Sequence, residues 1–309
     1  MLGSGPSADP VKPFRTTARR TLALAVALPA LLVGAASAGS KQPPATIVFP
    51  VLGPTTYTDD FGEARAGGPH QGIDMLAPKR ALAVAAEPGK VKFWAHSATA
   101  GCMLYLYGAS GTTYYYIHLN NDLTSRNDNR GKCVAGTAYA KGLKNGAQVG
   151  AGQVVGYVGD SGDANGIHPH LHFELHPNGG KAVDPYSWLQ SGQHLLFAAP
   201  RGSPFTLELR GTVAGVTDAS IRVKVASVNA WPMRQRQTKL KRKVLVDVPL
   251  GALVQMVAKF GGPGTPATLA DADTGQKVDV WTAVAPATLK AERGDDLALS
   301  ASLVSLVLR

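Results

Sequence analysis

Short stretches in which apolar and polar residues alternate recur along the chain, separated by turn signals, and this is the pattern of β-strands. They lie at 89–94, 103–107, 113–119, 153–158 and 171–175. Few segments repeat with the period of a helix. We therefore expect a mainly β protein in which residues 47–189 form a twisted antiparallel sheet or sandwich.

A second region with the same alternation follows a break in the pattern. Residues 190–204 predict a linker, after which 206–228 and 239–257 again alternate. The apolar end, 297–308, predicts a final strand or a short helix. We therefore expect residues 205–309 to form a smaller β domain, which resembles a small OB-like barrel.

One long segment of the first region does not alternate. Residues 120–147 are polar and rich in glycine, so they predict a surface loop. Loops of this length often border functional sites.

The first 38 residues have the order of a secretory signal peptide. Basic residues precede an apolar run from Leu22 to Val33, and the small residues Ala36-Ser37-Ala38 follow as a cleavage pattern. The run is shorter than the ~20 residues that cross a bilayer, which favours cleavage over a stable membrane anchor. Residues 39–46 then form a short N-terminal linker. We expect export to the periplasm, the cell envelope or the extracellular space, by the general secretory or the twin-arginine route.

Composition narrows the class of protein. The chain has 309 residues, of which 45% are hydrophobic and 17% charged, so it is not a disordered chain. Its 35 glycines and 21 prolines argue against a helical bundle. The formal charge of +10 indicates an anionic partner, which could be nucleic acid, lipid head groups or a wall polymer. Export argues against nucleic acid.

The chain has only two cysteines, Cys102 and Cys133. Thiols of exported proteins tend to pair, so we expect a disulfide bond between them. Two buried free thiols are the alternative. Neither cysteine lies in a Cys-x-x-Cys motif, which disfavours a redox-active or metal-binding pair.

Three of the eight histidines fall within residues 167–174. On a strand, alternate residues share a face. One face then carries His170, His172 and Glu174, and the other carries Leu171, Phe173 and Leu175. An unpaired buried ring costs about 1 to 3 kcal/mol, so two imidazoles on one face need a common partner. A metal ion would be such a partner.

A second candidate pair of ligands lies a hundred residues earlier, in His70-Gln71-Gly72-Ile73-Asp74. The central glycine favours an extended or turning segment over a helix. Together with the later histidines, this pair predicts two imidazoles and one carboxylate, a catalytic zinc set that leaves a position for water. His118, which follows Tyr116 in a predicted strand, is expected to share the face of Tyr116 and could reach the same cleft. On this residue alone, a core or surface histidine is the alternative.

Four motifs resemble, in order and spacing, the lysostaphin-type (LytM) zinc endopeptidases of bacterial cell walls. They are His70-x-Gly-x-Asp74, Tyr116-x-His118-Leu119, Gly156-x-x-Gly159-x-Ser161-Gly162 and His170-Leu171-His172-Phe173-Glu174. The resemblance covers residues 47–189 and implies an antiparallel β-sandwich of the duplicated hybrid motif type. His168 departs from the family pattern, and we interpret it as a loop residue, with a substrate contact left open.

The resemblance also implies a site and an activity. His70, Asp74 and His172 would hold one Zn²⁺ per chain, and His118 and His170 would be catalytic histidines that do not bind the metal. Such a protein would be a monomeric endopeptidase that hydrolyses peptidoglycan peptides. The family also includes non-hydrolytic activators of other wall hydrolases with broken sites, so the complete set of residues here favours catalysis. The bond that is cleaved stays open.

The predicted C-terminal domain is basic, with its densest run at residues 234–243. One hypothesis is that this run binds anionic wall polymer or peptidoglycan and holds the protein near its substrate. The alternative is a solvated hairpin.

Overall fold

The computed structural model describes residues 44–308. The predicted signal peptide, residues 1–38, lies outside the described residues, as does most of the predicted linker 39–46. Within the described part of the chain, no helix is both long enough and apolar enough to cross a membrane.

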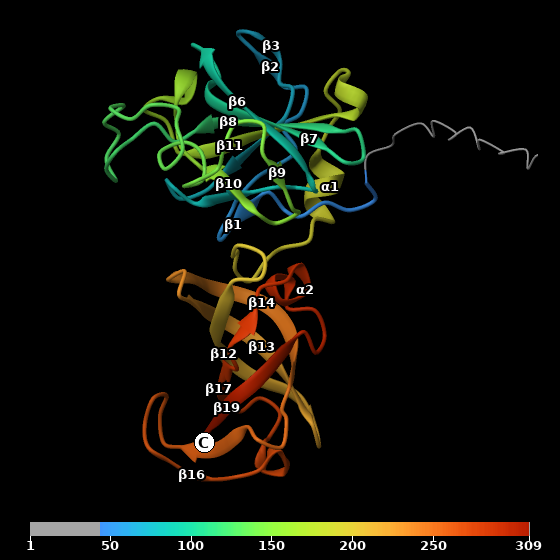
Figure 1. Cartoon of the computed structure of the whole chain (residues 1–309), viewed down its shortest axis with the longest axis vertical. Helices are drawn as coiled ribbons and strands as arrows, with labels where there is room; N and C mark the ends of the chain where they lie inside the picture. Colours follow the sequence, from blue (N-terminus) through green and yellow to red (C-terminus); the bar gives the residue numbers. More distant parts are fainter. Residues whose placement is uncertain (1–43, 309) are drawn as a thin grey trace, which may run out of the picture. The chain divides into compact units, whose positions relative to one another are not determined.

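The first region is built on a six-stranded sheet in the order β4-β11-β8-β7-β6-β9, in which all neighbours are antiparallel (Figure 1). Its strands are β4 (Ile73–Leu76), β6 (Gly89–Ser97), β7 (Gly101–Gly108), β8 (Thr113–Leu119), β9 (Gln148–Val149) and β11 (His170–His176). A three-stranded sheet has the order β1-β5-β10. Its strands are β1 (Val51–Leu52), β5 (Leu82–Val84) and β10 (Val154–Tyr157).

The two sheets share one hydrophobic core, so the predicted antiparallel sandwich is confirmed. Leu104, Tyr116 and Phe173 of the large sheet are fully buried in the same cluster as Ala83 and Val155 of the small one. This is the side that the alternation assigned to apolar residues. The polar positions of the same strands are left on the opposite face of the large sheet.

Short elements connect these strands. They are β2 (Ala64–Arg65), β3 (Gly68–Pro69), the 3₁₀ turns η1 (Gly162–Ala164) and η2 (Pro177–Gly179), and helix α1 (Tyr186–Gln190). Residues 120–147 contain neither helix nor strand, but the predicted surface loop lies only partly at the surface, because Ala138 and Tyr139 are fully buried in the core of the first region. The expected disulfide bond, Cys102–Cys133, joins this loop to β7.

The C-terminal region has the strand order β14-β13-β12-β17-β19, and β14 also pairs in parallel with β19, so the five strands close into a ring. These strands are β12 (Pro204–Thr217), β13 (Ser220–Trp231), β14 (Gln235–Asp247), β17 (Lys277–Thr282) and β19 (Leu299–Val307). The remaining elements of this region are β15 (Leu253–Val257), β16 (Gly264–Pro266), η3 (Leu269–Asp271), β18 (Ala285–Pro286) and α2 (Leu289–Arg293). The apolar end of the chain is therefore a strand.

Residues 190–204 lack strands until Pro204, yet some of their side chains are buried. Leu196 and Phe197 are fully buried in the hydrophobic cluster of the C-terminal region. That segment therefore contributes to the core of the second region besides connecting it to the first.

Candidate metal centre

The two ligand pairs predicted from sequence are brought together by the pairing of β4 with β11. Asp74 lies directly opposite His172 across these strands, on the face that is turned away from the core. His70 approaches from the segment between β3 and β4. Gly72 permits this approach, because a Cβ atom there would lie 2.5 Å from the Phe173 carbonyl oxygen and 2.8 Å from His172 Nε2.

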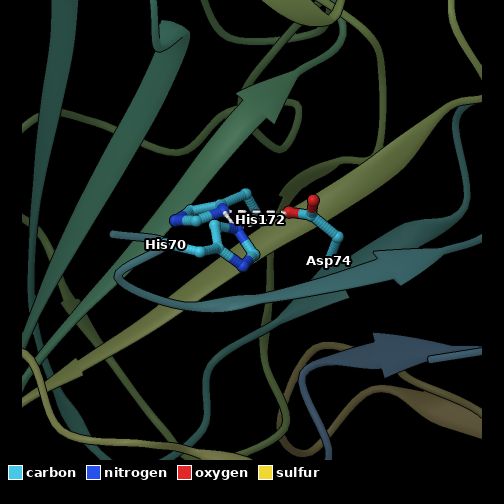
Figure 2. A group of neighbouring side chains, drawn as sticks. All are labelled: His70, Asp74 and His172. Atoms are coloured by element: carbon cyan, nitrogen blue, oxygen red, sulfur yellow. Dashed lines mark hydrogen bonds and ion pairs between the residues drawn. The ribbon is translucent and has the colours of Figure 1, made fainter. Parts of the chain in front are cut away.

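Three side-chain atoms converge at this point (Figure 2). His70 Nε2 is 2.8 Å from His172 Nδ1 and 3.2 Å from Asp74 Oδ1. His172 Nδ1 is 2.9 Å from the same Asp74 oxygen. The structure thus gathers the three residues that the sequence analysis predicted as metal ligands.

In each ring, the nitrogen that points away from the cluster makes a hydrogen bond, and this bond decides which nitrogen carries the proton. His70 Nδ1 lies 2.9 Å from the backbone oxygen of Asp60, which only accepts hydrogen bonds, so Nδ1 carries the proton. His172 Nε2 lies 3.0 Å from Glu174 Oε1, so Nε2 donates there. In their neutral forms both rings therefore turn an unprotonated nitrogen toward Asp74.

Such a cluster consists of acceptors only, and it requires a proton or a cation between them. In the metal-free protein a proton takes this place. Burial lowers the pKa of His172, but Asp74 and Glu174 outweigh burial and raise the pKa to about 9. Burial in turn raises the pKa of Asp74, and hydrogen bonds from His172 and His70 outweigh it and lower that pKa.

A divalent cation fits the same position. Two neutral imidazole nitrogens and one carboxylate oxygen are donors that suit zinc, and three protein ligands leave a fourth position for water or substrate. The second nitrogen of each ring is held by a carbonyl or a carboxylate, which is the usual outer shell of metal-binding histidines. The residues present therefore fit the metal that the sequence analysis predicted.

Arg65, on β2, is a neighbour of this cluster that sequence reasoning missed. Its Nη1 donates to Asp74 Oδ2 at 2.9 Å and its Nη2 to Asp60 Oδ2 at 3.0 Å. Because Arg65 occupies Oδ2, Oδ1 remains available to the cluster. No pattern in the sequence indicates this contact, which depends on the short hairpin of β2 and β3.

His118 reaches the site by a route that the sequence analysis did not foresee. We expected it to share the face of Tyr116, but Tyr116 is fully buried in the core. Leu104 pairs with Tyr116 and Cys102 with Leu119, so two residues of β8, Ile117 and His118, oppose one residue of β7. This β-bulge, with His118 at a φ of 60°, turns the imidazole to the outer face.

Ser161 holds the ring of His118. The Ser161 carbonyl oxygen lies 2.8 Å from His118 Nδ1, which therefore carries the proton and leaves Nε2 free. Burial lowers the pKa of His118 to about 4, and His170 acts in the same direction. The ring is thus neutral near pH 7. Its Nε2 lies 3.7 Å from a carboxylate oxygen of Asp163, an exposed residue.

His170 completes the group of histidines. Its Nδ1 lies 3.0 Å from the His168 carbonyl oxygen, and its Nε2 lies 3.7 Å from Asp74 Oδ1. The centres of the His118 and His170 rings are 4.9 Å apart. His168 itself is an exposed loop residue, as expected. All five predicted site residues line one open cavity of about 440 Å³.

Two further residues extend the site along β11. Glu174 Oε1 accepts from His172, and its other oxygen, Oε2, lies 2.5 Å from His176 Nε2. The sequence analysis placed Glu174 on the same face as the histidines but did not extend that face to His176, which is the next residue on it. The alternation that it used predicts His176 on the same face.

Comparison with known proteins agrees with this arrangement. Residues 134–185 match the model of peptidase family M23, and this match includes His170 and His172. An L-Ala--D-Glu endopeptidase of Bacillus subtilis (strain 168) is 28% identical over 154 residues, which are 46% of this chain and 42% of the relative. The chain thus spans less than half the length of that curated relative.

Two solved structures are similar to part of this chain. The catalytic domain of lysostaphin from Staphylococcus simulans is 25% identical, with 44% of this chain and 93% of that one covered and a TM-score of 0.34. The catalytic domain of the prophage-encoded M23 protein EnpA from Enterococcus faecalis is 28% identical, with 43% and 90% covered and a TM-score of 0.33. The match of residues 134–185 to the model of peptidase family M23 confirms the resemblance identified from sequence.

Proposed function

We propose that this protein is a zinc-dependent endopeptidase that hydrolyses peptide bonds in bacterial peptidoglycan. The observation that carries the proposal is the cluster of two imidazole nitrogens and one carboxylate oxygen, all acceptors, at the wall of an open cavity. The M23 domain and the similarity to an endopeptidase support the reaction class. Hydrolysis of purified peptidoglycan tests it.

His70, Asp74 and His172 would hold the metal. When bound, zinc supplies Lewis acidity, which makes water a better nucleophile at neutral pH and polarises a carbonyl group. Asp60 and Glu174 keep the two ligand rings in the tautomers that the metal needs, and Arg65 keeps Asp74 Oδ1 turned toward it. The chain thereby builds the site before the metal arrives.

His118 and His170 would act on the substrate side. Each ring donates its Nδ1 hydrogen to a backbone carbonyl, which leaves Nε2 available. Because the pKa of His118 is lowered to about 4, its Nε2 is unprotonated near pH 7 and can accept a hydrogen bond from a water molecule that it orients. His170, beside it, lines the same cavity and would hydrogen-bond the reacting groups there.

The decisive experiment is digestion of purified peptidoglycan with the full chain, with and without a chelator, followed by mass analysis of the released peptides. We expect new peptide termini, their loss on chelation and their return with added Zn²⁺. The same masses identify the bond that is cleaved. Absence of released peptides from the zinc-loaded protein would contradict the proposal and would favour a non-hydrolytic activator.

We further propose that the protein is exported. The signal-like residues 1–38 motivate this, and the disulfide bond between Cys102 and Cys133 supports it, because such bonds persist in oxidising compartments. Separating the culture medium, the envelope and the cytosol, followed by detection of the protein, tests it. Recovery only from the cytosol would contradict it.

The C-terminal region would bind anionic groups of the wall. Four exposed lysines lie on β13 and β14, and Lys224 lies directly opposite Lys243. The other two are Lys239 and Lys241. Like charges that lie directly opposite each other destabilise a sheet, so this lysine pair needs another reason. Lysines can protect an exposed strand edge, but Lys224 lies on β13, which is paired on both sides.

This surface is tested with a catalytically inert full chain that carries His118→Ala. We expect reversal of charge by Lys224→Glu and Lys243→Glu to reduce retention on purified walls at low salt, and high salt to abolish the difference. The matched control reverses two exposed lysines outside β13 and β14, by Lys259→Glu and Lys290→Glu. If the Lys224 and Lys243 variant is retained on the walls as strongly as the control variant, the proposal is contradicted.

A further inference from the structure

The strand that carries His172 continues with two more buried polar residues, Glu174 and His176. The three residues are 8%, 8% and 6% exposed, although they lie on the face of β11 that is turned away from the core. Polar groups that are buried to this extent are costly without partners. Their partners must therefore be sought on the same face.

The three side chains bind one another in sequence. Glu174 accepts from His172 Nε2 at 3.0 Å through Oε1, and its Oε2 lies 2.5 Å from His176 Nε2. His176 Nδ1 in turn donates to the Gly180 carbonyl oxygen at 2.8 Å, in the turn that follows the strand. A continuous row of hydrogen bonds thus runs from a backbone group to the ring of His172.

Aromatic rings of the neighbouring strands fix the far end of this row. Tyr115 of β8 lies directly opposite Glu174, and its ring stacks on that of His176 with centres 4.1 Å apart. Tyr105 of β7 stacks on Tyr115 at 4.0 Å. His176 is therefore held by a hydrogen bond along its plane and by a stacked ring on its face.

We propose that Glu174 and His176 are positioning residues for the metal centre, and that Tyr115 supports them. Rotation of the His172 ring would break its bond to Glu174 and turn Nδ1 away from His70 and Asp74. By holding Nε2, Glu174 keeps both the tautomer and the orientation that a metal needs, and His176 keeps Glu174 in place. The proposal rests on the proposed function only in that the site binds a metal.

A purely structural role is the competing explanation, and metal affinity separates the two. A structural pair would affect the melting temperature of the metal-free protein and leave the affinity of the folded protein unchanged. A positioning pair would weaken zinc binding even where the metal-free protein melts normally.

The experiment measures the Zn²⁺ dissociation constant of the full chain by competition with a chromophoric chelator, together with the absorption spectrum of the Co²⁺-loaded protein. We expect Glu174→Gln to weaken zinc binding by about 10- to 100-fold and to change the Co²⁺ spectrum. His176→Ala should weaken it by roughly 10-fold. His176→Arg, which again offers Glu174 a cationic donor, should restore most of the loss.

His168→Ala, which removes an exposed imidazole from the preceding loop, is the matched control and should leave the affinity unchanged. Unchanged affinity in Glu174→Gln and His176→Ala would overturn the proposal, and so would a loss that His176→Arg fails to restore. If Glu174→Gln does not fold, the zinc affinities of His176→Ala and His176→Arg are sufficient to test the proposal. Peptidoglycan hydrolysis by the wild-type chain separates the outcomes: if it persists while the variants bind zinc normally, only the positioning role fails.

Discussion

Two buried charged clusters in the first region differ in where their positive charge comes from. One consists of Lys79, Asp122 and Asp160. Lys79 Nζ lies 2.6 Å from an Asp122 oxygen and 3.1 Å from an Asp160 oxygen, and the two carboxylates are 0% and 2% exposed. This cluster contains its own cation, Lys79, and Asp160 Oδ1 is left without a hydrogen-bond partner.

The other cluster, His70, Asp74 and His172, directs only acceptors toward its centre. Its nearest permanent cation, Arg65, binds the outer oxygen of Asp74 and leaves the inner one free. Burial of carboxylates is common to both clusters and so does not mark a metal site. What marks it is that the chain fixes the protons of both imidazoles on the side away from the centre.

The largest effect is expected where the cluster of His70, Asp74 and His172 loses one of its ligands. His70→Ala should abolish tight zinc binding and reduce peptidoglycan hydrolysis by more than about 10³-fold, because the metal loses one of three protein ligands. Zinc binding is measured by metal analysis after dialysis. Excess Zn²⁺ should raise the melting temperature of the wild-type chain and not that of the variant. An active, zinc-loaded variant would contradict the ligand assignment.

Next in size is the loss of His118, which lies outside the ligand set. His118→Ala should retain zinc and lower kcat by about 10²- to 10⁴-fold, as expected for a general acid or base. The measurement pairs metal content with the rate of peptide release. Normal hydrolysis by the variant would refute the assigned role, whereas loss of zinc would show that His118 belongs to the ligand set.

The cluster of Lys79, Asp122 and Asp160 is tested by removal of its lysine. Lys79→Met should destabilise the protein by about 3 to 5 kcal/mol, because it removes the ammonium group that both buried carboxylates bind. Denaturant unfolding measures the loss, and Lys79→Arg, which keeps the charge, should lose less. We expect the same loss with and without chelator. A loss that depends on zinc would mean that the two clusters are not independent.

A further buried carboxylate, Asp279 of β17 in the C-terminal region, is only partly neutralised and sharpens the contrast. It is 3% exposed, and Arg210 Nε lies 3.6 Å from one of its oxygens. Burial, and then the nearby Glu208, raise the pKa of Asp279 to about 6, with Arg210 opposing.

Because this pKa is raised above the unfolded value, the native state holds the proton more tightly. The contribution of Asp279 to stability is therefore present below about pH 4 and is lost as the pH rises through about 6. Asp279→Asn should raise the free energy of unfolding at pH 7.5 by about 1 to 2 kcal/mol and have little effect at pH 4. Unfolding curves at the two pH values measure this. Equal effects at both would contradict the assigned pKa.

Much of the first region was predictable because one face of each strand is buried. The alternation predicted a strand at 113–119, and β8 is Thr113–Leu119. It predicted 171–175, and β11 is His170–His176. It also placed His170, His172 and Glu174 on one face, because that face is the one not occupied by the core residues Leu171, Phe173 and Leu175.

Other features could not be derived from alternation. The face of His118 was predicted wrongly because a bulge exists only relative to the partner strand β7. Arg65 was missed because its hairpin is too short to give a pattern. The disulfide bond was predicted correctly, since the two cysteines of the chain allow only one intramolecular pair.

The sequence by itself determined which residue types are available for chemistry and which side of a regular strand they occupy, because strand period and the alternation of apolar and polar residues are local properties. Tertiary structure alone decided that Asp74 lies opposite His172, that a bulge turns His118 outward, and which nitrogen of each ring faces the cluster. The physical reason is that pairing register and hydrogen-bond partners join residues far apart in the chain, and no local pattern records them.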